Sequence, residues 1–191
     1  MKVVAFSGSP RKEGNSERMI RRVFDILEEE GIQTEMVRIG GRLLQGCTAC
    51  NTCFKNRDES CSLPPDGLNE YIRKIVEADG IILASPTYFS DVTAEMKAFL
   101  DRCGMVGKAN GDLFQRKVGV AIVSVRRGGA IHALDTINHF FLTSQMIIPG
   151  SSYWNIGLGG AVGEVEEDDE GMATMELLGH NMAWLLRKIQ E

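Results

Sequence analysis

The chain has 191 residues, of which 43% are hydrophobic and 25% are charged; this is the composition of a globular protein that is long enough to bury a core. The formal net charge is −5 and the basic residues are scattered, which argues against a nucleic-acid partner because phosphate binding requires a positive field. No stretch approaches the roughly 20 apolar residues that span a bilayer, and the apolar run at 3–6 is too short for a signal-peptide core. We therefore expect a cytoplasmic protein with no membrane partner.

Short apolar runs alternate with amphipathic stretches in the first part of the chain. Residues 2–6 are β-branched and apolar and predict a buried strand that ends at a polar turn. Residues 15–30 predict a helix, because their apolar side chains recur on one face, and Gly31 is a typical helix stop. Residues 33–39 alternate as in a strand. A cysteine-rich loop follows at about 45–65.

The same alternation continues to the end of the chain. It predicts, in order, a helix over 66–78, a strand over 80–85, a helix over 92–103, a strand over 117–125, a helix over 131–143, a short strand over 146–148 and a helix over 168–188. Strands that alternate with helices imply a parallel sheet covered on both faces, a three-layer α/β/α sandwich with five strands. No linker divides the chain, so we predict one domain over 1–191. In such sheets ligands bind beyond the carboxyl ends of the strands.

The loop after the first strand has the composition of an anion-binding loop. It contains Ser9, Arg11, Asn15 and Ser16 and opens directly into the predicted helix, whose first N–H groups have no partner within the helix. The hydroxyl, amide and guanidinium groups of these four residues suit a phosphate. The loop lacks the glycine spacing of dinucleotide and nucleoside-triphosphate loops, which favours a phosphate monoester. The alternative is an ordinary capped turn.

Two later loops would lie near the same edge of the sheet. The loop after the third strand contains Pro86, Thr87, Tyr88 and Phe89. It offers backbone groups and aromatic rings to a flat heterocycle, although the two aromatic residues could equally belong to the core or to a dimer contact. After the fourth strand, Gly128 and Gly129 allow close backbone approach, and Arg126 or Arg127 is placed to face the electron-rich edge of such a ring.

Taken together, these motifs resemble the flavodoxin-like NADPH-dependent FMN reductase superfamily. The resemblance runs across nearly the whole chain and rests on Gly8–Arg11, Gly14–Ser16, Ser85–Tyr88, Lys97 and Asp101–Arg102. It implies a flavodoxin-like fold with FMN as the cofactor. By this resemblance, Ser9, Arg11, Asn15 and Ser16 would hold the FMN phosphate. Pro86 to Phe89 would contact the isoalloxazine ring, and the loop from Arg126 to Gly129 would close over it.

Four of the five cysteines lie in one short segment, at Cys47, Cys50, Cys53 and Cys61. In a reducing compartment they are poor disulfide candidates. Three thiols at three-residue intervals can wrap one face of a cubic iron–sulfur cluster, and a more distant fourth can close it. A four-thiolate zinc knuckle is a second possibility, although zinc sites more often use two separated pairs, and free thiols are a third. Thiolates suit iron–sulfur and zinc alike. The fifth, Cys103, is expected in the core.

The cysteine spacing is similar to that of the iron–sulfur flavoproteins, a branch of the same superfamily whose motif occupies the same place after the second strand. This resemblance implies a [4Fe–4S] cluster on the four cysteines that passes electrons to FMN. It also implies a homodimer or homotetramer, with a ferredoxin-like donor and a small-molecule or protein acceptor. The alternative is an NAD(P)H-dependent FMN or quinone reductase whose cysteines hold no metal. A non-catalytic module of the same fold is a third hypothesis.

Overall fold

The computed structural model describes residues 1–190. Its elements are, in chain order, β1 (Lys2–Ser7), α1 (Asn15–Glu29), β2 (Gln33–Arg38), α2 (Thr52–Asn56), α3 (Leu68–Glu77), β3 (Gly80–Pro86), α4 (Ala94–Ala109), β4 (Val118–Val125), α5 (Ala130–Thr143), β5 (Ile156–Leu158), the 3-10 helix η1 (Glu164–Glu167) and α6 (Asp169–Gln190). None of the helices within residues 1–190 is long and apolar enough to cross a membrane.

The five strands form one parallel sheet in the order β2-β1-β3-β4-β5. The direction in which the chain adds strands reverses between β1 and β3, so this pair marks the switch point at which ligands bind in open α/β sheets. The predicted α/β class and the five-stranded parallel sheet are confirmed.

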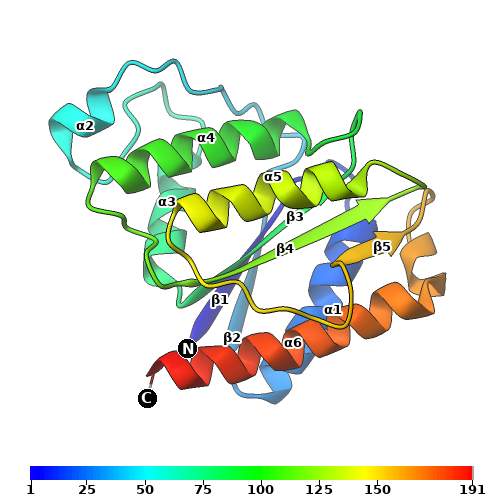
Figure 1. Cartoon of the computed structure of the whole chain (residues 1–191). Helices are drawn as coiled ribbons and strands as arrows, with labels where there is room; N and C mark the ends of the chain where they lie inside the picture. Colours follow the sequence, from blue (N-terminus) through cyan, green and yellow to red (C-terminus); the bar gives the residue numbers. More distant parts are fainter. Residues whose placement is uncertain (191) are drawn as a thin grey trace.

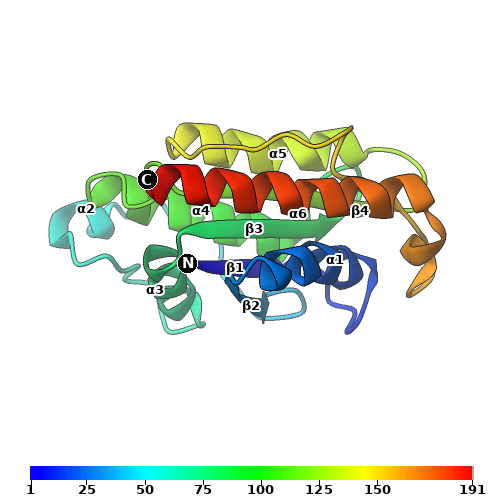
Figure 2. The ribbon, with the colours of Figure 1, turned by 90° about the horizontal axis from the view of Figure 1, so that it is seen from below.

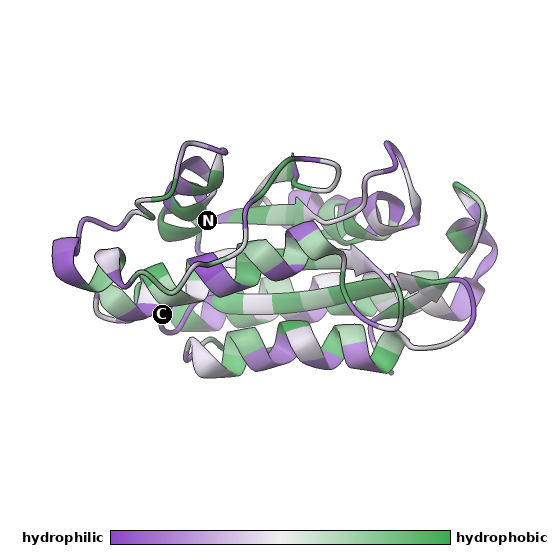
Figure 3. Cartoon of the chain, turned by 90° about the horizontal axis from the view of Figure 1, so that it is seen from above, coloured by the Kyte–Doolittle hydropathy of each residue, from purple (hydrophilic) through white to green (hydrophobic). Residues whose placement is uncertain are grey.

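Helices cover both faces of the sheet. Side chains of β1 alternate between the two cores, with Val4 and Phe6 on the side of α3, α4 and α5, and Val3 and Ala5 on the side of α1 and α6. Figure 1 shows α4 and α5 on one side of the strands and α1 and α6 on the other. In Figure 3 the strands are mostly hydrophobic, whereas the helices alternate between hydrophobic and hydrophilic segments. A strand that is buried on both faces reads as a continuous apolar run, which explains why these strands were predictable.

The fifth strand lies later in the chain than predicted. Ile147 forms only an isolated bridge to Val118, with its N–H on Lys117 O and its carbonyl on Gly119 N. Pro149 follows and has no N–H to continue the pairing. The chain leaves the sheet there and returns at β5, which pairs with Val123–Val125 at the carboxyl end of β4.

Other boundaries differ by less. The predicted helix over 92–103 continues as α4 to Ala109, because its glycines at 104 and 107 lie against the rings of Phe140 and Phe114 rather than at a turn. The short helix α2 interrupts the predicted cysteine-rich loop. Figures 1 and 2 both show α2 at one end of the molecule and the loop after β5 at the opposite end.

Candidate functional site

The loop between β1 and α1 is held closely against the edge of the sheet. Ser9 is buried, and its Oγ accepts a hydrogen bond from the N–H of Arg11 at 3.2 Å. Gly40, at the end of β2, approaches so closely that a Cβ there would lie 2.4 Å from Gly8 O. The N-cap of α1 is Gly14, which makes no side-chain capping bond. The start of α1 therefore presents backbone donors and the positive end of the helix dipole to an anion.

A hollow of about 170 Å³ opens beside this loop. The ends of four neighbouring strands supply its walls: Ser9, Arg11, Asn15, Pro86, Thr87, Tyr88, Ser124, Val125, Arg126, Gly159 and Gly160. This is the position beyond the carboxyl ends of the strands at which a ligand is expected. Because enclosed small-molecule sites usually exceed roughly 300 Å³, the hollow encloses only part of a ligand as large as FMN.

One polar atom in the wall of this hollow has no partner. Thr87 Oγ1 is shielded from solvent and makes no hydrogen bond with any residue in 1–190. The hydroxyl of Thr93 differs, because it accepts from Met96 N at 3.3 Å and donates to Gly8 O at 3.0 Å. An unpaired buried hydroxyl is costly and rare. It fits a ligand that carries hydrogen-bonding groups, as the isoalloxazine ring of FMN does with its carbonyl and N–H groups.

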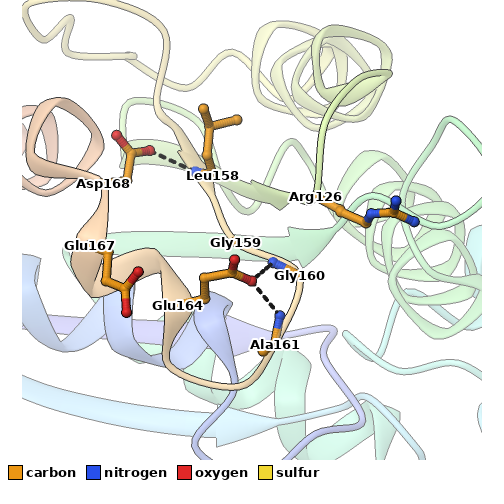
Figure 4. A pocket seen from close by; sticks show the side chains of 8 residues that line it. All are labelled: Arg126, Leu158, Gly159, Gly160, Ala161, Glu164, Glu167 and Asp168. Carbon is orange, nitrogen blue, oxygen red and sulfur yellow. Dashed lines mark hydrogen bonds between the residues drawn. The ribbon is translucent and has the colours of Figure 1, made fainter.

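The loop after β5 forms the outer wall of the hollow. Asn15 donates from Nδ2 to Ala161 O and accepts from Gly163 N, both at 2.9 Å. The carboxylate of Glu164 accepts from the N–H groups of Gly160 and Ala161, both at 2.6 Å, and Figure 4 shows it inside the curve of the loop. These backbone bonds hold the pKa of Glu164 below its ordinary value. The loop is thus fixed by α1 on one side and by its own carboxylate on the other.

The four clustered cysteines line one narrow hollow beside α4. The remaining wall residues are Thr48, Asn51, Ser62, Leu63, Arg102, Met105 and Val106. Cys47 and Cys50 are exposed, Cys61 is half-buried and Cys53 is buried. Within the described residues 1–190, no group of three Cys, His, Asp or Glu residues is placed to hold a metal ion.

The four thiols are donors of the kind that both zinc and an iron–sulfur cluster take. Zinc takes its thiolates at about 2.3 Å from one point. A [4Fe–4S] cluster takes four separate thiolates around its cubic core, so the sulfur atoms need to surround a shared space. The hollow measures about 20 Å³.

The thiols differ in how readily they ionise. Hydrogen bonds from Thr52, and further from Ser62, lower the pKa of Cys50 to about 7. Burial raises the pKa of the Cys53 thiol. Burial also strongly raises the pKa of Cys103, whose side chain is completely buried, so the predicted core position of this residue is confirmed. Since the thiolate is the metal-binding form, the lowered pKa of Cys50 favours coordination by this residue.

Comparison with known proteins identifies the family. The profile of the NADPH-dependent FMN reductase family matches residues 1–161. The chain belongs to this family. The FMN reductase match and the relatives described below make this chain an FMN-dependent redox protein, and its enzyme class is that of the flavin-dependent oxidoreductases.

Among the relatives of this FMN reductase family member is an iron–sulfur flavoprotein of Methanocaldococcus jannaschii. The two are 36% identical over 198 aligned positions, which cover 100% of each chain. RosB, solved with a bound 8-demethyl-8-formylriboflavin-5'-phosphate, has a TM-score of 0.78 and 20% identity over 100% of this chain and 80% of its own. A flavodoxin from the domain Archaea has a TM-score of 0.63 and 16% identity over 98% and 99% of the two chains. The predicted flavodoxin-like fold is confirmed.

Seven of the eleven residues predicted to contact the flavin line the hollow of this FMN reductase family member: Ser9, Arg11, Asn15, Pro86, Thr87, Tyr88 and Arg126. The other four are not among the residues that line it. Ser16 is buried, with its Oγ 2.8 Å from Ser124 Oγ. Phe89 is fully exposed on a left-handed turn with φ of 47°. Gly129 is the N-cap of α5 with φ of 86°, and Gly128 precedes it.

Sequence reasoning missed four residues of the hollow: Ser124, Val125, Gly159 and Gly160. Ser124 and Val125 end β4 and begin the loop predicted to approach the flavin, but they were given no contact of their own. The glycine pair was missed because the fifth strand was predicted at 146–148. A signal was present, since Ile156-Gly157-Leu158 is a short apolar run that ends at two glycines, the composition of a strand followed by a tight loop.

Proposed function

We propose that this flavin-dependent oxidoreductase is an iron–sulfur flavoprotein, which passes electrons between a [4Fe–4S] cluster and FMN. The observation that carries the proposal is that Cys47, Cys50, Cys53 and Cys61 line one hollow of an FMN reductase fold. The Methanocaldococcus relative that matches the full length bears the name iron–sulfur flavoprotein.

FMN supplies the redox chemistry when bound, and the side chains of this chain hold and orient it. We assign the phosphate to Ser9, Arg11 and Ser16 at the start of α1. Asn15 contributes by fixing the loop after β5, since its amide is bonded to Ala161 and Gly163.

We assign the isoalloxazine ring to the loops after β3 and β4. The residues proposed to contact or cover it are Pro86, Thr87, Tyr88, Phe89, Arg126, Gly128 and Gly129. Tyr88 is 46% exposed and Phe89 is fully exposed, so both aromatic side chains are free to pack on the ring where the hollow opens to solvent. The Thr87 hydroxyl would find its missing hydrogen bond there.

The two proposed cofactor sites lie apart within one chain. Thr93, just before α4, bonds to the β1 loop, whereas Arg102 further along α4 lines the cysteine hollow. The helix rises about 12 Å from Ala94 to Arg102, at roughly 1.5 Å per residue. We propose a homodimer or homotetramer, as the resemblance to the iron–sulfur flavoproteins implies, in which the cluster of one copy lies near the FMN of another.

The cellular context of this function is also a proposal. We propose that the chain is one domain over 1–191 in the cytoplasm, where a reducing environment suits exposed thiols. Its electron donor would be a ferredoxin-like protein, or NAD(P)H if the chain is a reductase without a cluster, and its acceptor a small molecule or a protein. The net charge of −5 supports a partner other than nucleic acid.

Anaerobic purification of the full chain tests the proposal. We expect bound FMN together with iron and acid-labile sulfide near four of each per monomer. The absorption spectrum should change in both the flavin and the iron–sulfur bands on reduction. Protein that contains FMN but no iron when prepared without oxygen would refute the cluster and leave the flavin assignment intact. Colourless protein that binds no flavin on titration would refute both.

A reductase that holds no cluster is the second candidate. It is favoured by the narrowness of the cysteine hollow, about 20 Å³. Under this alternative, NAD(P)H would be oxidised rapidly with a quinone, and Cys50→Ala would leave that rate unchanged. The iron–sulfur proposal instead predicts slow NAD(P)H oxidation and loss of iron in the same variant.

A further inference from the structure

Cys61 is held more tightly than the other clustered cysteines. Its N–H donates to Asn69 Oδ1 at 2.8 Å, and Asn69 Nδ2 donates back to Cys61 O at 3.0 Å. Its sulfur atom accepts a hydrogen bond from Arg102 Nε at 3.3 Å. The sulfur contacts of Cys50 and Cys53 are longer, 3.9 Å each. Both the backbone and the side chain of Cys61 are therefore fixed, by α3 and by α4 respectively.

Arg102 is a buried cation whose hydrogen bonds are directed at the cysteine-rich segment. Its side chain is only 2% exposed and forms an ion pair with Asp66. It also donates from Nη1 to Gln45 O at 3.1 Å, and Asp66 accepts from Gln45 N at 3.2 Å. A buried charge is stable only when it is paired and hydrogen-bonded. Asp66 neutralises the guanidinium, which leaves Nε free to donate to the sulfur atom.

We propose that Arg102 is a positioning residue for the cluster: it donates an N–H···S hydrogen bond to the Cys61 thiolate and holds both ends of the cysteine-rich segment on α4. This inference rests on the proposed function, because Cys61 is a cluster ligand only there. Hydrogen bonds to the ligand sulfur atoms help to set the reduction potential of a cluster. Because the reduced cluster carries one more negative charge, a donor at Cys61 favours it, and Arg102 raises the potential.

Three variants distinguish the effect of the hydrogen bond to Cys61 from an effect of positive charge alone and from a loss of folding. Arg102→Met combined with Asp66→Asn removes the hydrogen bond to sulfur without leaving an unpaired buried carboxylate. Arg102→Lys keeps the charge but shortens the side chain and removes the Nε–H donor. Lys108→Met is the matched control, since Lys108 is on the same helix, pairs with Asp112 at the surface and touches no cysteine.

The measurement is an anaerobic redox titration of the intact, FMN-containing protein, with the cluster followed by electron paramagnetic resonance. At the potential that half-reduces wild-type protein, we expect the ratio of reduced to oxidised cluster to fall about tenfold in Arg102→Met/Asp66→Asn. A tenfold change corresponds to about 59 mV for one electron. We expect a smaller change in the same direction in Arg102→Lys and no change in Lys108→Met.

Each remaining outcome has one meaning. Loss of iron from both Arg102 variants, with FMN content and circular dichroism retained, supports the assignment because the contacts removed are those that hold Gln45 and Cys61 on α4. Iron-loaded Arg102 variants with an unaltered potential would overturn it while the proposed function stands. Equal shifts in Lys108→Met would also overturn it, because they would show a general effect of charge. Wild-type protein without iron would refute the proposed function and this inference together.

Discussion

Removing the unpaired hydroxyl of Thr87 should raise the stability of the flavin-free protein and lower its affinity for FMN. Thr87→Val replaces the hydroxyl by a methyl group of nearly the same size and keeps the β-branched side chain. An unsatisfied buried polar group costs about 1–3 kcal/mol, so the flavin-free protein should become more stable, by about 1 kcal/mol. The same variant can no longer hydrogen-bond FMN. A net hydrogen bond contributes about 0.5–1.5 kcal/mol, so FMN should bind about 2- to 13-fold more weakly.

Thr93→Val is the matched control for this prediction. Thr93 is also buried and follows the same strand, but its hydroxyl bonds to Gly8 O and Met96 N. Its replacement leaves both groups unpaired and removes the N-cap of α4, which should cost the flavin-free protein about 2 kcal/mol. The two valine variants should therefore change stability in opposite directions.

Two measurements check the Thr87 prediction. Urea unfolding of flavin-free protein, followed by circular dichroism, gives the change in the free energy of unfolding. Quenching of FMN fluorescence gives the dissociation constant. A loss of stability in Thr87→Val comparable to that in Thr93→Val would show that the hydroxyl is satisfied in solution. Unchanged FMN affinity would show that the ligand does not reach this wall of the hollow, and the reasoning would fail.

Two further variants test what holds the flavin site in place. Burial alone would raise the pKa of the Glu17 carboxyl, but hydrogen bonds from Arg38 and from the backbone outweigh it, so the pKa lies below the ordinary value of 4.5. The ionised carboxylate therefore stabilises the fold above pH 4.5, and this stabilisation is lost as the pH falls through the lowered pKa. Glu17→Gln should cost about 1–3 kcal/mol of unfolding free energy at pH 7. The difference from the wild type should shrink as the pH falls through the lowered pKa of Glu17, and a difference that stays constant in acid would contradict this. Gly40→Ala should weaken FMN binding at least tenfold in fluorescence titration, because its Cβ would lie 2.3 Å from the Ser9 backbone. Gly46→Ala, with open space around it, should have no effect, and equal losses in both variants would refute the steric argument.

The sequence predicted the sheet well because its central strands are apolar on both faces. A run such as Ile81-Ile82-Leu83-Ala84 has no exposed side, so neither its register nor its neighbours affect its recognition as a buried strand. The position of the first loop was predictable for a similar reason, since its polar composition and its place before α1 both indicate a turn at the start of a helix. Local pattern and tertiary environment agree at these positions.

The fifth strand could not be placed in this way. Both candidate runs, 146–148 and 156–158, are short and apolar, and both pair with β4, one at each end. The choice between them depends on Pro149, which ends the first pairing, and on Asp168, whose carboxylate accepts from Leu158 N at 2.7 Å. The second contact joins β5 to the residue just before α6, and no pattern in the strand itself reports it. The glycines at 159 and 160 were lost from the predicted site with the strand that precedes them.

The sequence predicted the clustered thiols of the cysteine-rich segment but not its backbone conformation, and the φ values explain why. Ala49, Asn51, Arg57 and Glu59 all have positive φ values, between 52° and 57°, a conformation that is unfavourable for most residues other than glycine. Residues are held in such conformations only where surrounding contacts outweigh the local cost. Here those contacts come from outside the segment, from α3 and from Arg102 on α4. Because the local sequence does not favour these backbone conformations, the shape of the segment depends on its contacts with α3 and α4, and in that shape the four thiols line one hollow.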